Sequence, residues 1–473
     1  PRQPQLGSSQ CAFGFLPVSS LSLSLSLCCS RLHHARGFME RLLHLPGVKL
    51  TDLSVFANQR PPIVPHPAPQ FPPASSMLLR FTGRVWPGTR GRFAGVSYLS
   101  VTAGPVITGH PCNNVSPSVA AKIGKDLHRR PAHPLGIIKE RITLYFQRDA
   151  QVLGQPPFQV FDNLPPIVTV EQNFDELLIP PDHVSRQASD TYYVDDQRVL
   201  RCHTSAHQTA LLRQGEDRFL VCGDVYRRDE VDSTHYPVFH QMEGVRVLTE
   251  AEAPAKLDDS QRKEIASQDL KRGLEGLATS LFGDVEMRWV DAYFPFTAPS
   301  AELEILFRGK WLEVLGCGVI QDEVMDNAGR RGEIGWAFGL GLERLAMVLF
   351  SIPDIRLFWS EDPRFSSQFE AQTLTTFQPY SKYPPCYKDV TFWLPDENFH
   401  NNDLFEVVRD VAGDLVEEIQ LLDDFLHPKT QRRSRCFRIT YRCMDRSLTN
   451  EEVDQLQDVV RRNITNRLKA ELR

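Results

Sequence analysis

One strand–loop–strand segment near the middle of the chain carries residue types that could do chemistry on a phosphate. Its loop contains Arg227 and His235, and arginine presents a planar fork of donors that fits phosphate oxygens. On the second strand, Phe239, Gln241 and Glu243 share one face because side chains alternate along a strand. An aromatic plate can stack on a base, and an amide beside a carboxylate can hold an ammonium group. A solvated hairpin with surface charges would carry the same residues, so this segment alone leaves both interpretations open.

A second segment, residues 335–347, has the pattern of a strand that turns directly into a helix. We expect Gly339 and Gly341 to let the backbone make that turn. Arg344 then falls in the first helical turn, where the helix dipole also favours an anion. A glycine pair before a helix indicates a phosphate site only when a second cation lies nearby in the fold.

Together, the arginine hairpin and the Gly-Leu-Gly-Leu-Glu-Arg sequence resemble motifs 2 and 3 of class II aminoacyl-tRNA synthetases. Three more stretches, residues 173–183, 203–208 and 293–296, narrow the resemblance to phenylalanyl-tRNA synthetases. The resemblance implies attachment of phenylalanine to tRNA(Phe) through a phenylalanyl-adenylate, with ATP and Mg²⁺ required. A single chain with its own C-terminal module is similar to the mitochondrial form of the family, which implies a monomer.

The resemblance also implies roles for matching positions. Arg227 is expected to bind the α-phosphate, Arg344 the γ-phosphate, and Glu313 to bind Mg²⁺ or ATP, which makes these three the expected catalytic residues. An ordinary strand carboxylate is the alternative for Glu313. The expected ATP site comprises Arg227, Asp229, Thr234, His235, Tyr236, Phe239, Glu313 and Arg344. The expected phenylalanine site comprises His203, Ser205, Ala206, His207, Gln208, Gln241, Met242, Glu243, Phe294, Phe296, Ala337 and Phe338.

Within the expected phenylalanine site, aromatic and small residues would determine which amino-acid side chain fits. Phe294 and Phe296 would pack edge-on against its ring, and the small Ala337 would leave room for that ring. Ordinary core packing is the alternative for the two phenylalanines. The acid in the hairpin is Asp229, where many class II enzymes have glutamate, and the connector between residues 247 and 281 is short for the family.

The elements that must position these residues indicate an α+β fold. Residues 121–372 mix short strands with helical patterns near 135–142 and 251–280 and a strand-turn-helix at 335–350, which predicts an antiparallel sheet flanked by helices. The resemblance implies that this is the class II synthetase sheet. A proline-rich linker at 373–385 leads to residues 386–473. By the resemblance, these form a ferredoxin-like βαββαβ anticodon-binding domain.

The pattern within residues 386–473 predicts two clear strands and two helices. The strands are 388–394 and 435–442, with Phe437, Ile439 and Tyr441 facing inward, and the helices are 403–419 and 451–468. Only residues 469–473 remain for a last strand, whose existence stays open. We expect tRNA to contact Arg435, Arg438 and Arg442, although a solvated charged face would have the same composition.

The first part of the chain has a different composition. Residues 1–76 are low-complexity sequence, which we expect to be an extension foreign to the native protein. Residues 77–120 contain several arginines and no acid, which predicts a mitochondrial transit peptide and a location in the matrix. A disordered basic tail is the alternative.

Whole-chain composition narrows the choice of function. The formal net charge is -6, so nucleic-acid contact must come from a local patch. No run of 18 apolar residues is present, which predicts no membrane span. Two hypotheses compete: an active ligase, and a catalytically inactive synthetase-like protein that binds RNA. The joint presence of Arg227, Glu313 and Arg344 favours the ligase.

Overall fold

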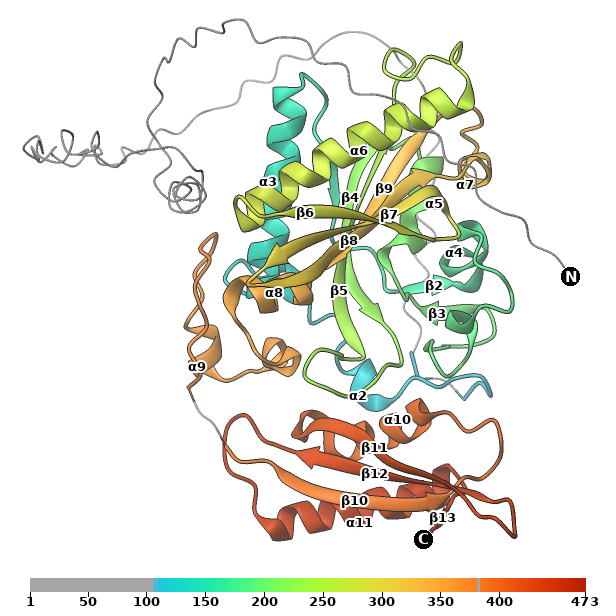
Figure 1. Cartoon of the computed structure of the whole chain (residues 1–473), viewed down its shortest axis with the longest axis vertical. Coiled ribbons are helices and arrows are strands. Elements are labelled where there is room, and N and C mark those ends of the chain that lie inside the picture. Colours follow the sequence, from blue (N-terminus) through green and yellow to red (C-terminus); the bar gives the residue numbers. More distant parts are fainter. Residues whose placement is uncertain (1–105, 108, 381–382) are drawn as a thin grey trace, which may run out of the picture. The chain divides into compact units, whose positions relative to one another are not determined.

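The computed structural model describes residues 106–107, 109–380 and 383–473 (Figure 1). Its centre is a seven-stranded sheet in the order β1-β4-β5-β9-β8-β7-β6. Every neighbouring pair is antiparallel except β1 and β4, which confirms the predicted antiparallel sheet. The strands are β1 (Gln159–Phe161), β4 (Arg218–Tyr226), β5 (Val238–Val247), β6 (Met287–Ala292), β7 (Thr297–Phe307), β8 (Lys310–Ile320) and β9 (Gly335–Gly341).

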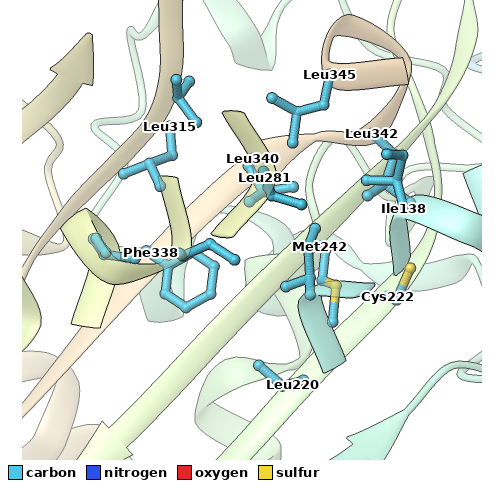
Figure 2. Packing of buried hydrophobic residues seen from close by; sticks show 14 of the residues in the cluster. Ile138, Leu220, Cys222, Met242, Leu281, Leu315, Phe338, Leu340, Leu342 and Leu345 are labelled. Atoms are coloured by element: carbon cyan, nitrogen blue, oxygen red, sulfur yellow. The ribbon is translucent and has the colours of Figure 1, made fainter. Parts of the chain in front are cut away.

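Three helices pack against one face of this sheet. They are α3 (Pro134–Val152), α6 (Asp259–Phe282) and α8 (Leu342–Phe350). Asp258 caps α6 and shares a capping box with Gln261, which fixes where the helix begins. Leucine and isoleucine side chains from all three helices join residues of β4, β5, β8 and β9 in one buried cluster (Figure 2). Burial of this face stabilises the sheet and leaves its other face available for a site.

Shorter elements complete this part of the chain. They are α2 (Pro117–Ala120), β2 (Ile167–Thr169), α4 (Val170–Asn173), β3 (Arg198–Leu200), α5 (Gln208–Arg213), α7 (Asp322–Asn327) and α9 (Pro363–Ser366), with 3₁₀ turns at Leu127–Arg129, Asp175–Leu177, Val184–Arg186, Thr204–His207 and Ile355–Trp359. Strands β2 and β3 pair as a small separate sheet. Among the described residues, no helix has the length and apolarity that crossing a membrane requires.

The structure shifts two predicted boundaries. Val115 and Val119 are buried, and Asn114 accepts a hydrogen bond of 2.6 Å from the backbone of Tyr193. The predicted start of the catalytic domain at residue 121 is therefore too late, because the preceding residues belong to its core. Residues 1–105 and 108 lie outside the described residues. The foreign extension at 1–76 and most of the transit peptide at 77–120 therefore stay predictions. The predicted linker also begins too early, since Phe377 is buried in the main core.

The C-terminal module has the predicted βαββαβ order. Its four-stranded antiparallel sheet runs β11-β12-β10-β13. The elements are β10 (Cys386–Trp393), α10 (Asn401–Ala412), a 3₁₀ turn at Gly413–Leu415, β11 (Val416–Leu426), β12 (Arg433–Tyr441), α11 (Asn450–Arg467) and β13 (Glu471–Leu472). Phe437, Ile439 and Tyr441 are fully buried, as predicted. The short last strand exists and pairs with β10.

One helix prediction in this module is wrong. The expected helix at 403–419 ends at Ala412, because Gly413 takes a positive φ of 54° that terminates it. Residues from Val416 onward form β11, whose outer part is exposed and contains the two adjacent aspartates Asp423 and Asp424. The predicted helix was too long because it included residues 416–419, the start of β11, which do not alternate clearly between polar and apolar.

From the packing under the sheet we expect two alanine substitutions on α3 to differ in their effect on stability. Phe146 is 2% exposed and stacks on Phe338, with ring centroids 5.2 Å apart. We expect Phe146→Ala to lower the free energy of unfolding by about 3–5 kcal/mol. Val152→Ala, at an exposed position near the end of the same helix, should change it by less than about 0.5 kcal/mol. Urea unfolding followed by circular dichroism measures both, and equal effects would contradict this packing.

Candidate active site

Two adjoining cavities lie beside β5, β8 and β9. The larger, of about 560 Å³, is lined by aromatic side chains from the 294–296 segment together with polar residues of the 202–205 turn. The smaller, of about 280 Å³, is lined by the loop before β5 and by the start of α8. Both cavities share Arg227, Asp229, Gln241, Glu313 and Gly339. The shared residues make them two halves of one site, with an arginine at the junction.

Strand β5 supplies one wall of both cavities. Phe239 lines the smaller cavity, Glu243 the larger and Gln241 both, as expected from their common face. Met242 lies between them on the opposite face, fully buried in the main core (Figure 2). The two-residue period of a strand turns the side chain of Met242 away from both cavities, so its expected contact with phenylalanine stays a prediction for its backbone.

A buried carboxylate closes one end of the larger cavity. Glu243 is 2% exposed, and its Oε2 accepts a hydrogen bond of 3.3 Å from the hydroxyl of Thr204. Within the described part of the chain, its Oε1 has no hydrogen-bond partner. Burial raises the pKa of Glu243 to about 7. A desolvated carboxylate with one free oxygen is suited to bind a cation that enters the cavity.

The turn after Cys202 contributes to this cavity only through part of its length. His203 and Ser205 line it, and burial lowers the pKa of His203 to about 3, so its ring is neutral at pH 7. Ala206 instead packs in a small apolar cluster under the turn, and His207 accepts a hydrogen bond of 2.9 Å from Arg201. The 3₁₀ turn points these two side chains away from the cavity. The expected contact of these two residues with the substrate therefore stays a prediction for their backbone atoms.

Gln208 follows the same turn and begins α5. Its amide is buried, and neither its Oε1 nor its Nε2 has a partner among the described residues. It does not line the larger cavity, so its predicted contact with the substrate lacks support in this arrangement.

Aromatic and small residues form the apolar wall of the larger cavity. The rings of Phe294 and Phe296 lie 6.1 Å apart, with their planes 24° from parallel. Gly316 makes room for the first ring, because a Cβ there would come within 2.7 Å of Phe294. Ala337 also lines the wall. Phe338 borders the cavity too, but its ring is buried in the main core.

Arg227 is anchored at the junction of the cavities. Its Nε donates a hydrogen bond of 2.9 Å to the backbone carbonyl of Cys202, and its guanidinium carbon lies 5.1 Å from the centre of the Phe239 ring. Both contacts hold the arginine fork over the strand face that carries Gln241.

Comparison with known proteins decides the family. Residues 119–369 match the model "tRNA synthetases class II core domain (F)", and residues 381–473 match "Ferredoxin-fold anticodon binding domain". The chain is 58% identical over 364 residues to the chloroplastic/mitochondrial phenylalanine–tRNA ligase of Arabidopsis thaliana, covering 77% of this chain and 83% of that protein. It is 51% identical over 373 residues to the mitochondrial phenylalanine–tRNA ligase of Mus musculus, covering 73% and 83%. The chain belongs to the class II phenylalanyl-tRNA synthetase family.

In this synthetase, helix α8 is tied directly to β5 by a pair that the sequence did not reveal. The backbone N–H of His240 donates to Glu343 over 2.8 Å, and its Nδ1 lies 2.7 Å from the same carboxylate. Both side chains are buried. The next residue, Arg344, is thereby held over the smaller cavity, in the first turn of α8 as predicted.

Arg344 faces a group of carboxylates on β7 and β8. It donates to Glu313 over 3.0 Å, and Glu302 lies on the adjacent strand and lines the larger cavity. Burial raises the pKa of Glu302, and the neighbouring carboxylates of Glu313 and Glu304 raise it further. Carboxylate oxygens are ligands that Mg²⁺ prefers, and Glu302 and Glu313 line the same cavity, so these two residues fit the ion that the family implies. The sequence does not indicate Glu302, because only the pairing of β7 with β8 brings its strand alongside that of Glu313; in this pairing Glu302 lies opposite Gly316 and Glu304 opposite Glu313.

The loop residues of the smaller cavity differ in what they contact. Asp232 accepts hydrogen bonds from the backbone N–H of Thr234 and His235 and pairs with the His235 ring over 2.7 Å. That pairing raises the pKa of His235. Asp229, expected only in the ATP site, lines both cavities. Tyr236 borders the smaller cavity, but its hydroxyl donates to Asp414 of the C-terminal module over 2.5 Å.

The three arginines expected to contact tRNA all have acidic partners in the module. Arg438 donates two hydrogen bonds of 2.9 Å to Asp389, Arg435 pairs with Asp424 and Arg442 with Glu417. Arg438 is about half exposed on the sheet. A phosphate at this surface would therefore have to compete with carboxylates already in place.

Ionisation of Glu243 is expected to control the affinity for phenylalanine. Its raised pKa means that the carboxyl is protonated below pH 7 and then no longer attracts an ammonium group. The kcat/KM for phenylalanine should fall about tenfold per pH unit below the pKa. Steady-state kinetics between pH 5.5 and 8.5 measures this, with kcat/KM for ATP as the reference.

Replacing that carboxyl supplies the control for the pH effect. Glu243→Gln should bind phenylalanine less tightly and show a flat kcat/KM profile across the same range. A profile in the variant identical to that of the unmodified protein would assign the titration to another group.

Proposed function

We propose that this chain joins phenylalanine to tRNA(Phe) in the mitochondrial matrix, using ATP and Mg²⁺ and acting as a monomer. One observation carries the proposal: an aromatic cavity that ends in a buried carboxylate adjoins a second cavity with two arginines, and Arg227 lies at their junction. An amino acid in the first cavity and a nucleotide in the second would meet at that arginine.

Phenylalanine would enter the larger cavity with its ring against Phe294, Phe296 and Ala337. Its ammonium group would meet Glu243 and the Gln241 amide at the polar end. This orientation directs the substrate carboxylate toward Arg227. The apolar wall fits an aromatic ring, and it discriminates weakly, by about a hundredfold, against a ring with an added hydroxyl.

ATP would occupy the smaller cavity with its adenine on Phe239. His235 and Arg344 would contact the outer phosphates, and Arg227 the α-phosphate. An oxygen of the phenylalanine carboxylate attacks the α-phosphorus, the bond to the bridging oxygen breaks, and pyrophosphate leaves. No general base is needed because a free carboxylate is already ionised at pH 7.

Catalysis of this step then consists of alignment and charge neutralisation. Arg227 holds the α-phosphate in line with the attacking oxygen and offsets the charge that develops on it. Mg²⁺, held by Glu313 and Glu302, would supply further neutralisation of the phosphate charge. In the second step, a ribose hydroxyl at the end of the tRNA attacks the adenylate carbonyl, and AMP leaves.

The C-terminal module would bind tRNA(Phe) through Arg435, Arg438 and Arg442. Their side chains lie on or beside β12, and arginine pairs well with phosphate groups. The alternative, an inactive RNA-binding protein, is disfavoured because Arg227, Glu313 and Arg344 are all present and all line the smaller cavity.

Amino-acid-dependent exchange of pyrophosphate into ATP tests the substrate directly. With all twenty amino acids assayed separately and no tRNA present, we expect exchange with phenylalanine and much weaker exchange with tyrosine. Absence of exchange with phenylalanine would refute the proposed function.

Two arginine substitutions separate the expected roles of the domains. Arg227→Ala should lower phenylalanine-dependent exchange at least about a hundredfold, since it removes the cation at the reacting phosphate. Arg438→Ala should retain exchange and raise the KM for tRNA in the charging reaction. Intact charging by Arg438→Ala at low tRNA concentration would exclude a contact between this arginine and tRNA.

A further inference from the structure

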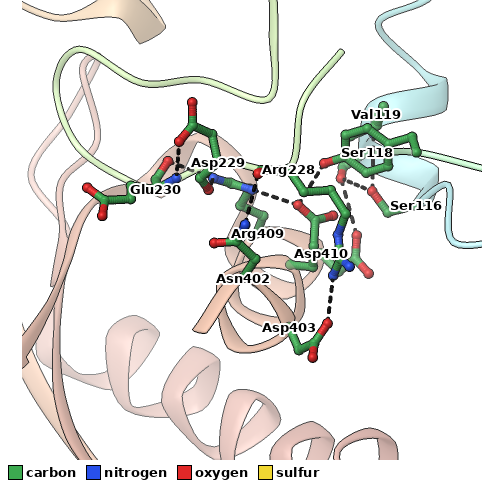
Figure 3. Close-up of polar contacts among 12 residues, drawn as sticks. Ser116, Ser118, Val119, Arg228, Asp229, Glu230, Asn402, Asp403, Arg409 and Asp410 are labelled. Carbon is green, nitrogen blue, oxygen red and sulfur yellow. Dashed lines mark hydrogen bonds and ion pairs between the residues drawn. The ribbon is translucent and has the colours of Figure 1, made fainter. Parts of the chain in front are cut away.

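The loop that follows Arg227 is bound along its backbone by the C-terminal module (Figure 3). Four successive carbonyls, those of residues 228 to 231, accept hydrogen bonds from that module. Asn402 donates to the first over 2.9 Å, Arg409 to the second and, over 2.7 Å, to the third. The backbone N–H of Ile419 donates to the fourth over 3.0 Å. The module thereby fixes the backbone of this loop whatever side chains the loop carries.

Side chains of the loop reinforce the attachment. Arg228 donates to Asp403 over 3.0 Å, and the side chain of Val231 is buried in the apolar core of the module. At the far end of the loop, the hydroxyl of Tyr236 donates to Asp414. The whole stretch from 228 to 236 is therefore held at both ends and in the middle.

Arg409 is the central donor, and its own position is fixed. It is 7% exposed and donates over 2.6 Å to Glu406, whose carboxylate also accepts the Tyr192 hydroxyl over 2.7 Å. A buried guanidinium is costly unless its donors are used. Here the N–H groups of its Nη2 donate to two loop carbonyls, so the buried guanidinium and the loop supply hydrogen-bond partners to each other.

The loop that the C-terminal module binds lies directly beside the proposed reaction site. Residues 228–231 directly follow Arg227, and Asp229 within them lines both cavities. Without the module, four carbonyls would turn to water and the loop could take many conformations. Each ATP molecule that binds would then have to order the loop, and the conformational entropy lost by the loop would lower the affinity for ATP.

We propose that the C-terminal module is a working part of the ATP site, with Arg409 and Asn402 as positioning residues for adenylate formation. The inference rests on the proposed function, because it concerns the same cavities. It assigns to the module a role in the step that precedes any contact with tRNA. Amino-acid activation in the absence of tRNA is therefore the reaction that reports it.

The test uses Arg409→Gln in the full-length chain, measured by phenylalanine-dependent pyrophosphate exchange without tRNA. We expect the KM for ATP to rise about tenfold, as expected for loss of charge-assisted hydrogen bonds, and the KM for phenylalanine to change less than twofold. Arg409→Lys, which keeps a charged donor, should give an intermediate KM for ATP. Arg461→Gln, in an exposed pair on α11, is the matched control and should leave both constants unchanged.

Two further measurements separate positioning from simple loss of folding. Rates are normalised to active sites by titration, so a smaller folded fraction does not mimic a change in KM. Hydrogen exchange at residues 228–231 should be faster in Arg409→Gln than in Arg461→Gln. If Arg409→Gln does not fold, Asn402→Asp replaces it, because its carboxylate cannot donate to the carbonyl of residue 228.

The outcomes are distinct. A raised KM for ATP together with faster loop exchange supports the proposal. Unchanged ATP kinetics in the folded variant, or equal effects on the KM of ATP and of phenylalanine, overturns it. Absence of exchange in the unmodified protein would instead refute the proposed function itself.

Discussion

The register of β5 between β4 and β9 is the constraint on which the site depends. Gln241 pairs with Gly223 on one side and Gly341 on the other, and Glu243 pairs with Gly339. On the opposite face of the same strand, Met242 is buried under α3 and α8 with the other apolar residues of the core. A slip of one residue would exchange the two faces. Burial of the core therefore stabilises a register in which the polar residues face the cavities.

Glycines beside β5 keep the space above it free. A Cβ at Gly339 or Gly341 would meet nothing within 4 Å, and both residues line the smaller cavity. The expectation that these glycines turn the backbone is wrong, since neither has a positive φ and Gly341 is an extended helix cap. Their role is to leave room, and the buried pair of His240 and Glu343 fixes the turn into α8 instead.

Local patterns predicted much of the fold and part of the site. Alternation placed Phe239, Gln241 and Glu243 on one face, and the same rule places the side chain of Met242 on the other. Long-range pairing could not be predicted: Glu302 and Glu313 line one cavity only because β7 pairs with β8, with Glu302 opposite Gly316. The attachment of the loop by the C-terminal module joins residues about 180 positions apart in sequence, which no local period reveals. Strand β11 was missed because its exposed outer part has two adjacent leucines followed by two adjacent aspartates, which breaks the apolar alternation that marks a strand.

The central claim is that the two adjoining cavities hold the two halves of one phenylalanyl-adenylate, with Arg227 between them. A crystal structure with a non-hydrolysable phenylalanyl-adenylate analogue tests it most directly. The account predicts the benzyl ring beside Phe294 and Phe296, the adenine on Phe239, and the linking group within hydrogen-bond distance of Arg227. Adenine in the aromatic cavity, or an analogue bound without contact to Arg227, would contradict it.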